Sequence, residues 1–147
     1  PFVAGQTDDR QALARFTPVY AYESCDPAAA ESHVHARFHQ IGCGHDSDLG
    51  SLFQWDDFGG RRPNFSPQQQ ALAETMGRYW GAFAATGDPN TAGLPHWPRQ
   101  LGGEAPVMVL GSAASGGVHA ISGQTYETEH KTAFWRLLLW FAQLTGR

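Results

Sequence analysis

A long helix with a clear start and a clear end is the feature that most constrains how this chain can fold. The helix is predicted over residues 67–85, with a proline in its first position. Ser66 is the expected N-cap, and Gln69 falls where its side chain can complete a capping box. Gly87 ends the helix, and Pro89 prevents it from resuming. Its apolar residues recur at helical spacing and form one stripe: Leu72, Met76, Tyr79, Trp80 and Phe83.

Shorter elements are predicted before this helix. Thr7 is a suitable N-cap for a helix over residues 7–16, which has two acidic residues in its first turn and Pro18 after its end. Residues 19–23 are rich in aromatic side chains and begin with a β-branched valine, which predicts a strand. Residues 49–55 are predicted to form a short helical turn.

Two strands and one further helix are predicted after it. Residues 107–110 form a short apolar strand, and residues 118–121 are predicted to pair back with it as a hairpin. The last helix is predicted to run to about Leu144, with Thr125 or Thr128 as its cap. Apolar residues cover so much of the circumference of this helix that we expect it to lie against a larger body.

The composition indicates an ordered globular protein and excludes two classes of partner. Of the 147 residues, 41% are hydrophobic and 12% are aromatic, which argues against disorder. The net charge of −4 leaves no basic surface for nucleic acid. The longest apolar run, residues 137–142, is far too short to cross a membrane. No signal peptide is visible, but the chain starts without Met, so both a secreted and a cytoplasmic location stay open.

The chain has two cysteines, Cys25 and Cys43. A disulfide between them would close a loop of moderate size. Pairing requires the two Cα atoms to lie close together, which the sequence does not establish. A disulfide and two free buried thiols are therefore both open at this point.

A histidine in a glycine-rich turn is the strongest candidate for a reactive side chain. His45 follows Gly42 and Gly44 and precedes Asp46 and Asp48. Glycine adopts backbone dihedrals that other residues resist, so such a turn can aim an imidazole at a partner group elsewhere. Imidazole is also the side chain best suited to move protons near neutral pH. The turn therefore predicts His45 as a proton-transfer residue.

Motifs around the central helix resemble those of a known enzyme family. They are Tyr-Trp at 79–80, Phe-Ala at 83–84, Thr-Gly-Asp-Pro-Asn at 86–90 and Trp-Pro at 97–98. The pattern is similar to that of the type-B carboxylesterases, members of the α/β-hydrolase family that include the para-nitrobenzyl esterases. Residues 18–23 resemble the strand before the family's catalytic-histidine loop, and residues 130–135 resemble its closing helix.

The turn at His45 resembles the loop that carries the catalytic histidine of this family. That loop usually reads His-Gly-x-Glu-Leu, and residues 45–49 read His-Asp-Ser-Asp-Leu. The resemblance implies that His45 is the catalytic histidine. Asp48 stands where the family has Glu, and we expect it to be a structural carboxylate rather than the acid of the triad. Leu49 and Phe53 either help to pack the loop or line an acyl pocket, or they are plain core residues, which is the commoner role.

The resemblance extends over nearly the whole chain, from about Thr7 onward, but covers only the last third of the family's enzyme. It implies an α/β fold in which residues 1–147 form the C-terminal part of an α/β-hydrolase: the last strands, the catalytic-histidine loop and the C-terminal helices. The family's serine and acid precede the histidine in the chain and have no match here. Ser115 lies in a near miss to Gly-x-Ser-x-Gly, but it follows His45 and falls in a predicted hairpin turn, so we do not assign it as the nucleophile.

The function implied by the resemblance is hydrolysis of carboxylic esters, with His45 as general base and general acid of a serine mechanism. No cofactor and no metal are expected, and the substrate is a small ester. A complementary N-terminal polypeptide is the expected partner, because the serine, the acid and the oxyanion hole are not found in this sequence.

Two other interpretations stay open. A non-catalytic truncated product or interaction piece would expose the edge strand at residues 19–23 and the apolar last helix. A metal-binding module is suggested by a cluster of ligand-type residues, although their spacing matches no standard zinc signature. The cluster consists of His33, His35, His39, Cys43 and His45.

Overall fold

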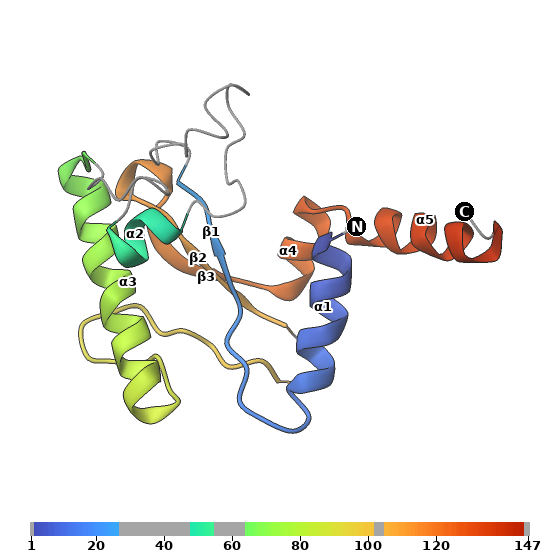
Figure 1. The fold of residues 1–147 in the computed structure, drawn as a ribbon, viewed down its shortest axis with the longest axis horizontal. Helices are drawn as coiled ribbons and strands as arrows, with labels where there is room; N and C mark the ends of the chain where they lie inside the picture. Colours follow the sequence, from blue (N-terminus) through green and yellow to red (C-terminus); the bar gives the residue numbers. More distant parts are fainter. Residues whose placement is uncertain (1, 27–47, 55–63, 102–104, 146–147) are drawn as a thin grey trace. The chain divides into compact units, whose positions relative to one another are not determined.

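The structure is a computed structural model that describes residues 2–26, 48–54, 64–101 and 105–145. Within these residues it combines α-helices with short strands, as expected for an α/β protein (Figure 1). The elements, in chain order, are α1 Phe2–Leu13, β1 Tyr22–Ser24, α2 Leu49–Phe53, α3 Pro67–Thr86, β2 Val107–Leu110, the 3₁₀ turn η1 Ala113–Ser115, β3 Val118–Ile121, α4 Gly123–Glu129 and α5 Thr132–Thr145.

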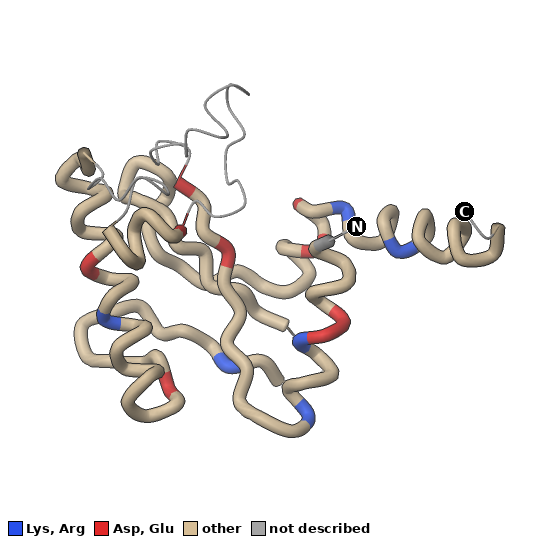
Figure 2. The backbone as a smooth tube through the Cα atoms, viewed as in Figure 1, with Lys and Arg blue, Asp and Glu red and all other residues tan. Residues whose placement is uncertain are grey.

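Charged residues of both signs are interspersed along the described chain (Figure 2). Helix α1, for example, carries Asp8, Asp9 and Arg10 in succession. None of the helices in the described ranges is both long and apolar enough to cross a membrane.

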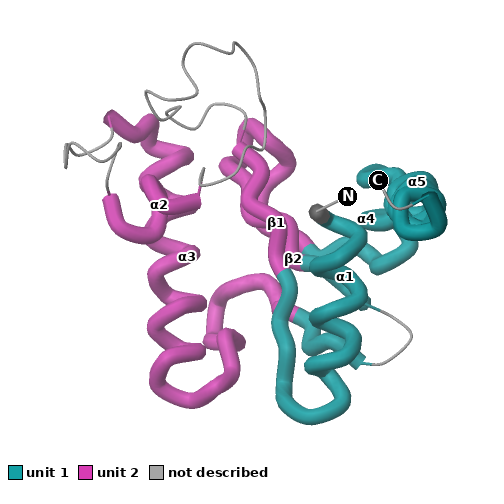
Figure 3. The backbone as a smooth tube through the Cα atoms, turned by 45° about the vertical axis from the view of Figure 1, so that its right-hand side comes forward, with its two compact units in different colours: residues 1–21, 98–107, 120–147 teal, residues 22–97, 108–119 magenta. Residues whose placement is uncertain are grey.

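The contacts divide the chain into two compact units (Figure 3). Unit 1 comprises residues 1–21, 98–107 and 120–147, and it includes helices α1, α4 and α5. Unit 2 comprises residues 22–97 and 108–119, and it includes β1, α2, α3 and η1. Each unit is described on its own below.

Helix α3 of unit 2 confirms the prediction for the central helix. Ser66 Oγ accepts a hydrogen bond from the Gln69 N–H at 3.3 Å, and Gln69 Oε1 accepts one from the Ser66 N–H at 3.0 Å. Gly87 ends the helix with a φ of 78°, and its N–H donates to the Phe83 carbonyl at 2.7 Å. Leu72, Met76 and Tyr79 of the predicted stripe are buried, whereas Phe83, at its end, is 47% exposed.

Strands β1, β2 and β3 form one sheet in that order. β1 runs parallel to β2, with Tyr22 opposite Met108. Residues 111–117 join β2 to β3 and are too few for a parallel crossover, so these two strands form the predicted hairpin. The predicted start of β1 at residue 19 is wrong, because the Val19 carbonyl accepts a hydrogen bond from the Gln100 N–H at 2.8 Å instead of joining the ladder with β2.

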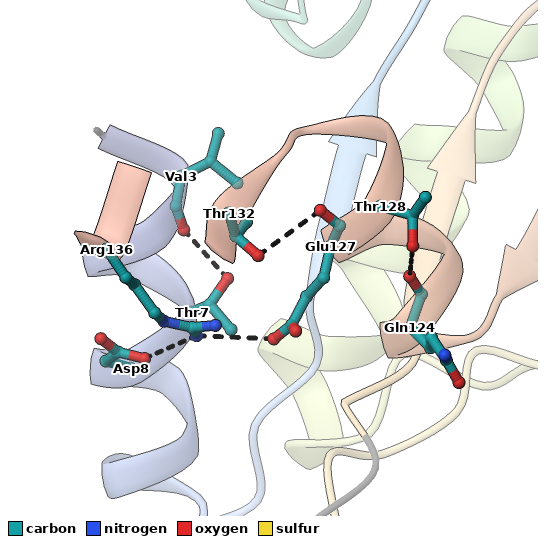
Figure 4. Close-up of polar contacts among 8 residues, drawn as sticks. All are labelled: Val3, Thr7, Asp8, Gln124, Glu127, Thr128, Thr132 and Arg136. Carbon is teal, nitrogen blue, oxygen red and sulfur yellow. Dashed lines mark hydrogen bonds and ion pairs between the residues drawn. The ribbon is translucent and has the colours of Figure 1, made fainter. Parts of the chain in front are cut away.

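Helix α1 of unit 1 begins earlier than predicted, so Thr7 is not an N-cap. Thr7 lies in the middle of the helix and is completely buried. Its hydroxyl donates to the Val3 carbonyl one turn back, at 2.9 Å (Figure 4). A threonine whose hydroxyl hydrogen-bonds to a carbonyl of its own helix does not act as an N-cap.

The predicted last helix is two helices, α4 and α5. Ser122 caps α4, because its Oγ accepts a hydrogen bond from the Thr125 N–H at 3.0 Å. The expectation that Thr125 or Thr128 is the cap is therefore wrong. Lys131 has a φ of 52°, a left-handed conformation that a helix cannot contain, and it separates α4 from α5.

Unit 1 has a small apolar core and one polar junction between its helices. Val107, Tyr126 and Ala21 are buried together, with Ile121 packed against them. Arg136 of α5 donates to a carboxylate of α1 at 2.8 Å and lies 3.5 Å from a carboxylate of α4 (Figure 4). Seven large apolar side chains of α5 are 41–64% exposed, namely Phe134, Leu137, Leu138, Leu139, Trp140, Phe141 and Leu144.

Ser66→Ala should lower the free energy of unfolding by about 1 kcal/mol, because the Gln69 N–H loses its capping acceptor. Urea unfolding followed by tryptophan fluorescence measures this, since Trp80 lies on α3. Gln68→Ala changes an exposed side chain in the first turn of the same helix and is the matched control. Equal midpoints for Ser66→Ala and the unsubstituted chain would contradict the capping role.

Candidate functional site

The segment that carries His45 lies outside the described residues, which end at Asp26 and resume at Asp48. These two carboxylates are therefore the last described residue before that segment and the first described residue after it. Both accept hydrogen bonds from side chains of unit 2. The described part of the candidate site consists of Asp26, Asp48 and the side chains that bind them.

Asp48 is bound to strand β1. It occupies the N-cap position of α2, but its carboxylate caps no N–H of that helix. Instead, Asp48 Oδ2 accepts a hydrogen bond from the Tyr22 hydroxyl at 2.7 Å. Burial of the ring, followed by the hydrogen bond and the charge of Asp48, raises the pKa of Tyr22, so the hydroxyl keeps its proton and remains a donor. The contact is of the kind expected of a structural carboxylate.

The ring of Tyr22 belongs to a cluster of four aromatic side chains in unit 2. Tyr22 meets Trp80 edge-on at a centroid distance of 5.0 Å and Trp97 at 5.9 Å. Tyr79 meets Trp97 edge-on at 5.1 Å, and its hydroxyl donates to the Pro95 carbonyl at 2.6 Å. Pairs of this geometry contribute about 0.5–1.5 kcal/mol each beyond their burial. The cluster joins β1, α3 and the loop after α3, and so fixes the hydroxyl that holds Asp48.

The Thr-Gly-Asp-Pro-Asn motif places Trp97 in this cluster. Thr86 Oγ1 accepts from the Asp88 N–H at 3.1 Å, and Asp88 Oδ1 accepts from the Asn90 N–H at 2.9 Å. Asn90 then contacts the backbone of Trp97 twice, accepting from its N–H at 2.8 Å and donating to its carbonyl at 3.0 Å. These residue types are needed because each one hydrogen-bonds a backbone group of the loop.

Ser115 lies in η1, in the connection between β2 and β3, where the sequence predicts a turn. Its Oγ donates to Asp26 Oδ1 at 2.8 Å and lies 3.1 Å from Ser112 Oγ. Sequence reasoning missed Asp26, because an aspartate followed by proline at a strand end ordinarily marks an exposed turn. Its position three residues after the end of a predicted strand is the one available signal.

Leu49 and Phe53 are not core residues. They lie on α2, and their side chains are 42% and 61% exposed. The expectation that they are plain core residues is therefore wrong for the described structure, whereas a role in lining an acyl pocket stays a prediction.

Cys25 is held in a disulfide, so the interpretation that both cysteines are free buried thiols is wrong. The only other cysteine of the sequence is Cys43, which lies outside the described residues. Among the residues that the structure does describe, no group of three or more His, Cys, Asp or Glu side chains could hold a metal ion. The cluster considered as a metal site lies outside them: His33, His35, His39, Cys43 and His45.

A family model described as "Carboxylesterase family" matches residues 3–135, which is most of the chain. The chain belongs to the carboxylesterase family. The carboxylesterase Est55 of Geobacillus stearothermophilus is a structural relative with a TM-score of 0.60 and 26% identity, covering 88% of this chain and 25% of that chain. A thermophilic PNB esterase also matches with a TM-score of 0.60, at 18% identity, over 84% of this chain and 23% of that one. PNB esterases are α/β-hydrolases, so the fold is part of an α/β-hydrolase, as predicted.

The sequence of this carboxylesterase chain is also similar to that of human cocaine esterase, with 35% identity over 81 residues. That match covers 55% of this chain and 14% of the human protein. The chain thus spans only a small part of the length of the relatives that it matches.

In this carboxylesterase chain, burial is the largest cause that raises the pKa of both Tyr22 and Tyr79. An alkaline titration followed by tyrosinate absorbance should therefore show a component that ionises late, and Tyr22→Phe should reduce this component. The unfolded chain loses the Tyr22 proton near pH 10, whereas the folded chain keeps it. The stability from this group is thus complete below about pH 10 and decreases as the pH rises further.

Tyr79→Phe is the matched control for this titration, because it should also reduce the late component while leaving the bond from Tyr22 to Asp48 in place. A late component that is unchanged in Tyr22→Phe would contradict the contact between Tyr22 and Asp48.

Proposed function

We propose that this chain provides the catalytic histidine, His45, of a serine carboxylesterase that hydrolyses small carboxylic esters. The observation that carries the proposal is the family match over residues 3–135, a range that includes His45, where the sequence resembles the family's histidine loop. The nucleophilic serine and the acid are then supplied by residues outside this chain, in the family order of serine, acid and histidine.

The chemistry assigned to His45 is proton transfer in both halves of the reaction. A serine hydroxyl is too weak an acid to attack an ester unaided, so the imidazole takes its proton during the attack and returns it to the leaving alcohol. A carboxylate on the far imidazole nitrogen fixes the tautomer and stabilises the imidazolium. Backbone N–H groups stabilise the oxyanion, at about 3–4 kcal/mol for each donor lost. No cofactor takes part.

The contact between Tyr22 and Asp48 supports this assignment. Asp48 lies three residues after His45 in the sequence, and its 2.7 Å hydrogen bond from Tyr22 fixes the chain at that position. A proton-transfer group must stay within about 2.6–3.2 Å of its partner, so the backbone beside it has to be held firmly. In this proposal Asp48 has the positional role that the family gives to a glutamate.

The proposed partner is a complementary N-terminal polypeptide, with residues 1–147 as the C-terminal segment of a single α/β-hydrolase domain. Two features support this arrangement. Strand β1 is at an edge of the sheet that the described residues form, and sheet edges are where further strands add. Helix α5 exposes seven large apolar side chains, and patches of this kind mark interaction surfaces. The proposal includes no nucleic-acid or membrane partner, and it leaves the location of the protein open.

A non-catalytic piece is the second candidate, favoured by the chain's small coverage of its relatives, 14% of human cocaine esterase. Expression of the complete reading frame that contains this chain decides between the two. A Gly-x-Ser-x-Gly motif followed by Glu or Asp, upstream of residue 1, together with hydrolysis of p-nitrophenyl acetate, would favour the enzyme. A reading frame without such a serine would favour the non-catalytic piece.

His45→Ala in the complete protein should lower kcat by about 10⁴–10⁶-fold while the fold is kept, because the serine loses its base. Ester hydrolysis and the melting temperature are measured together. His119→Ala replaces an exposed histidine on β3 and is the matched control, with an expected kcat close to that of the unsubstituted protein. Near-normal turnover by His45→Ala would refute the assignment.

A further inference from the structure

The side of helix α5 that faces the rest of unit 1 is polar. Thr132 is 1% exposed, and its hydroxyl donates to the Glu127 carbonyl at 3.4 Å. Arg136, one turn further along, binds the carboxylates of Asp8 and Glu127 (Figure 4). Gln143 follows Arg136 by seven residues, so it lies on nearly the same side of the helix. Polar contacts at the start of this side therefore attach α5 to its own unit.

Another side of α5 carries a continuous apolar row. Four apolar residues recur at spacings of three, four and three, the pattern with which helices pack in coiled coils; they are Phe134, Leu137, Phe141 and Leu144. Two more apolar residues flank this row, Leu138 and Trp140. All six side chains are 47–64% exposed. We call these six residues the α5 seam.

The side chains of the α5 seam are of the types that protein interfaces favour. Its two adjacent rings, Trp140 and Phe141, meet edge-on at a centroid distance of 5.1 Å. Aromatic residues are enriched in the buried centres of interfaces, and tryptophan is prominent among the residues that contribute most to binding. The seam also contains no charged residue that would lose its hydration on burial. It is therefore suited to pack against another protein surface.

Most of the α5 seam lies beyond the part of the chain that matches the family. The family model covers residues 3–135, which include Phe134 but none of the other five seam residues. The complementary N-terminal polypeptide would complete the domain that the family shares. The seam from Leu137 onward is an addition to that matched range, which favours an occupant other than the missing part of the same domain.

A lipid surface fits the α5 seam poorly. Helices that lie in a membrane interface combine an apolar face with a strongly charged polar face. The one charged residue of α5 is Arg136, and carboxylates of unit 1 already bind it. The net charge of −4 also works against binding to anionic headgroups.

A second copy of the chain fits the α5 seam in both charge and area. A symmetric contact places a surface against itself, so charged residues in it would face their own kind. The seam has none. If each of the six side chains exposes about 100 Å², two copies bury about 1,200 Å² between them, which is the size of the smaller specific interfaces.

We propose that the α5 seam is a dimer interface, in which the seams of two copies of this protein pack against each other. Arg136 stays paired within its own unit in this dimer. The inference goes beyond the proposed function and does not rest on it, since neither His45 nor catalysis is involved.

Sedimentation equilibrium of the complete protein tests the inference, and we expect a reversible equilibrium between monomer and dimer. Phe141→Glu removes one ring and adds one charge in each of the two seams, so the dissociation constant of the dimer should increase at least about 100-fold. Gln143→Glu adds the same charge at an exposed position outside the seam and is the matched control. Its dissociation constant should stay within about twofold of that of the unsubstituted protein.

The melting temperature shows whether each variant is folded. Phe141 is 51% exposed in the single chain, so we expect Phe141→Glu to fold. If it does not, Leu144→Gln replaces it, because this seam residue is 64% exposed and lies in the last turn of α5. Leu144→Gln should increase the dissociation constant about 10-fold.

Three results would overturn the inference. The first is a complete protein that stays monomeric up to about 100 μM. The second is a dimer whose dissociation constant changes neither in Phe141→Glu nor in Leu144→Gln, because its interface then lies elsewhere. The third is a monomer that co-sediments with phosphatidylcholine vesicles through the seam, which would assign this surface to lipid. A dimer that is sensitive to Phe141→Glu but does not hydrolyse p-nitrophenyl acetate would refute the proposed function alone.

Discussion

One side chain, Gln69, provides hydrogen-bond partners for two polar groups of unit 2 at once. The first turn of a helix has N–H groups without intrahelical partners, and the buried carboxylate of Asp26 needs donors. The amide oxygen of Gln69 accepts from the Ser66 N–H, and its nitrogen donates to Asp26. Only 8% of the Gln69 surface is exposed, so water competes little for either hydrogen bond. The capping box of α3 therefore also orients the helix relative to the end of β1.

The motif that is most specific to the family serves the fold rather than the reaction. Asn90 holds the backbone of Trp97, and Trp97 packs against Tyr22 in the aromatic cluster. Tyr22 in turn holds Asp48 beside the His45 segment. A match to this motif therefore indicates the architecture that holds Asp48, and the chemistry has to be argued from His45 itself. This explains how a chain can belong clearly to an enzyme family while its activity remains a proposal.

The sequence predicted the elements whose causes are local and missed those decided by distant contacts. Helix α3 is fixed by neighbours such as Ser66 and Gly87, so its bounds and both of its caps were predictable. Thr7 looks like a cap in sequence, but the helix starts upstream and buries it. The left-handed Lys131 that divides α4 from α5 has no sequence signature, because it is neither glycine nor asparagine.

The same distinction applies to the candidate site. The glycine-rich turn around His45 is a local pattern and was found, together with the carboxylate of Asp48 that follows it. The hydrogen bonds to Asp26 come from Gln69 and Ser115, which are 43 and 89 positions away, so no local pattern could reveal them. The bond from Tyr22 to Asp48 likewise spans 26 positions and depends on the fold of unit 2.

The contributions of ion pairs and of apolar burial can be compared for helix α5. Its ion pair joins Arg136, 36% exposed, to Asp8, 60% exposed, and such surface pairs contribute about 0–1 kcal/mol. Full burial of a leucine or phenylalanine side chain contributes about 1.5–3 kcal/mol, and residues such as Leu137 and Trp140 are still about half exposed. The apolar surface of α5 therefore outweighs its polar contacts several-fold. A polypeptide that covered this surface would contribute more to holding α5 in place than the bond from Arg136 does.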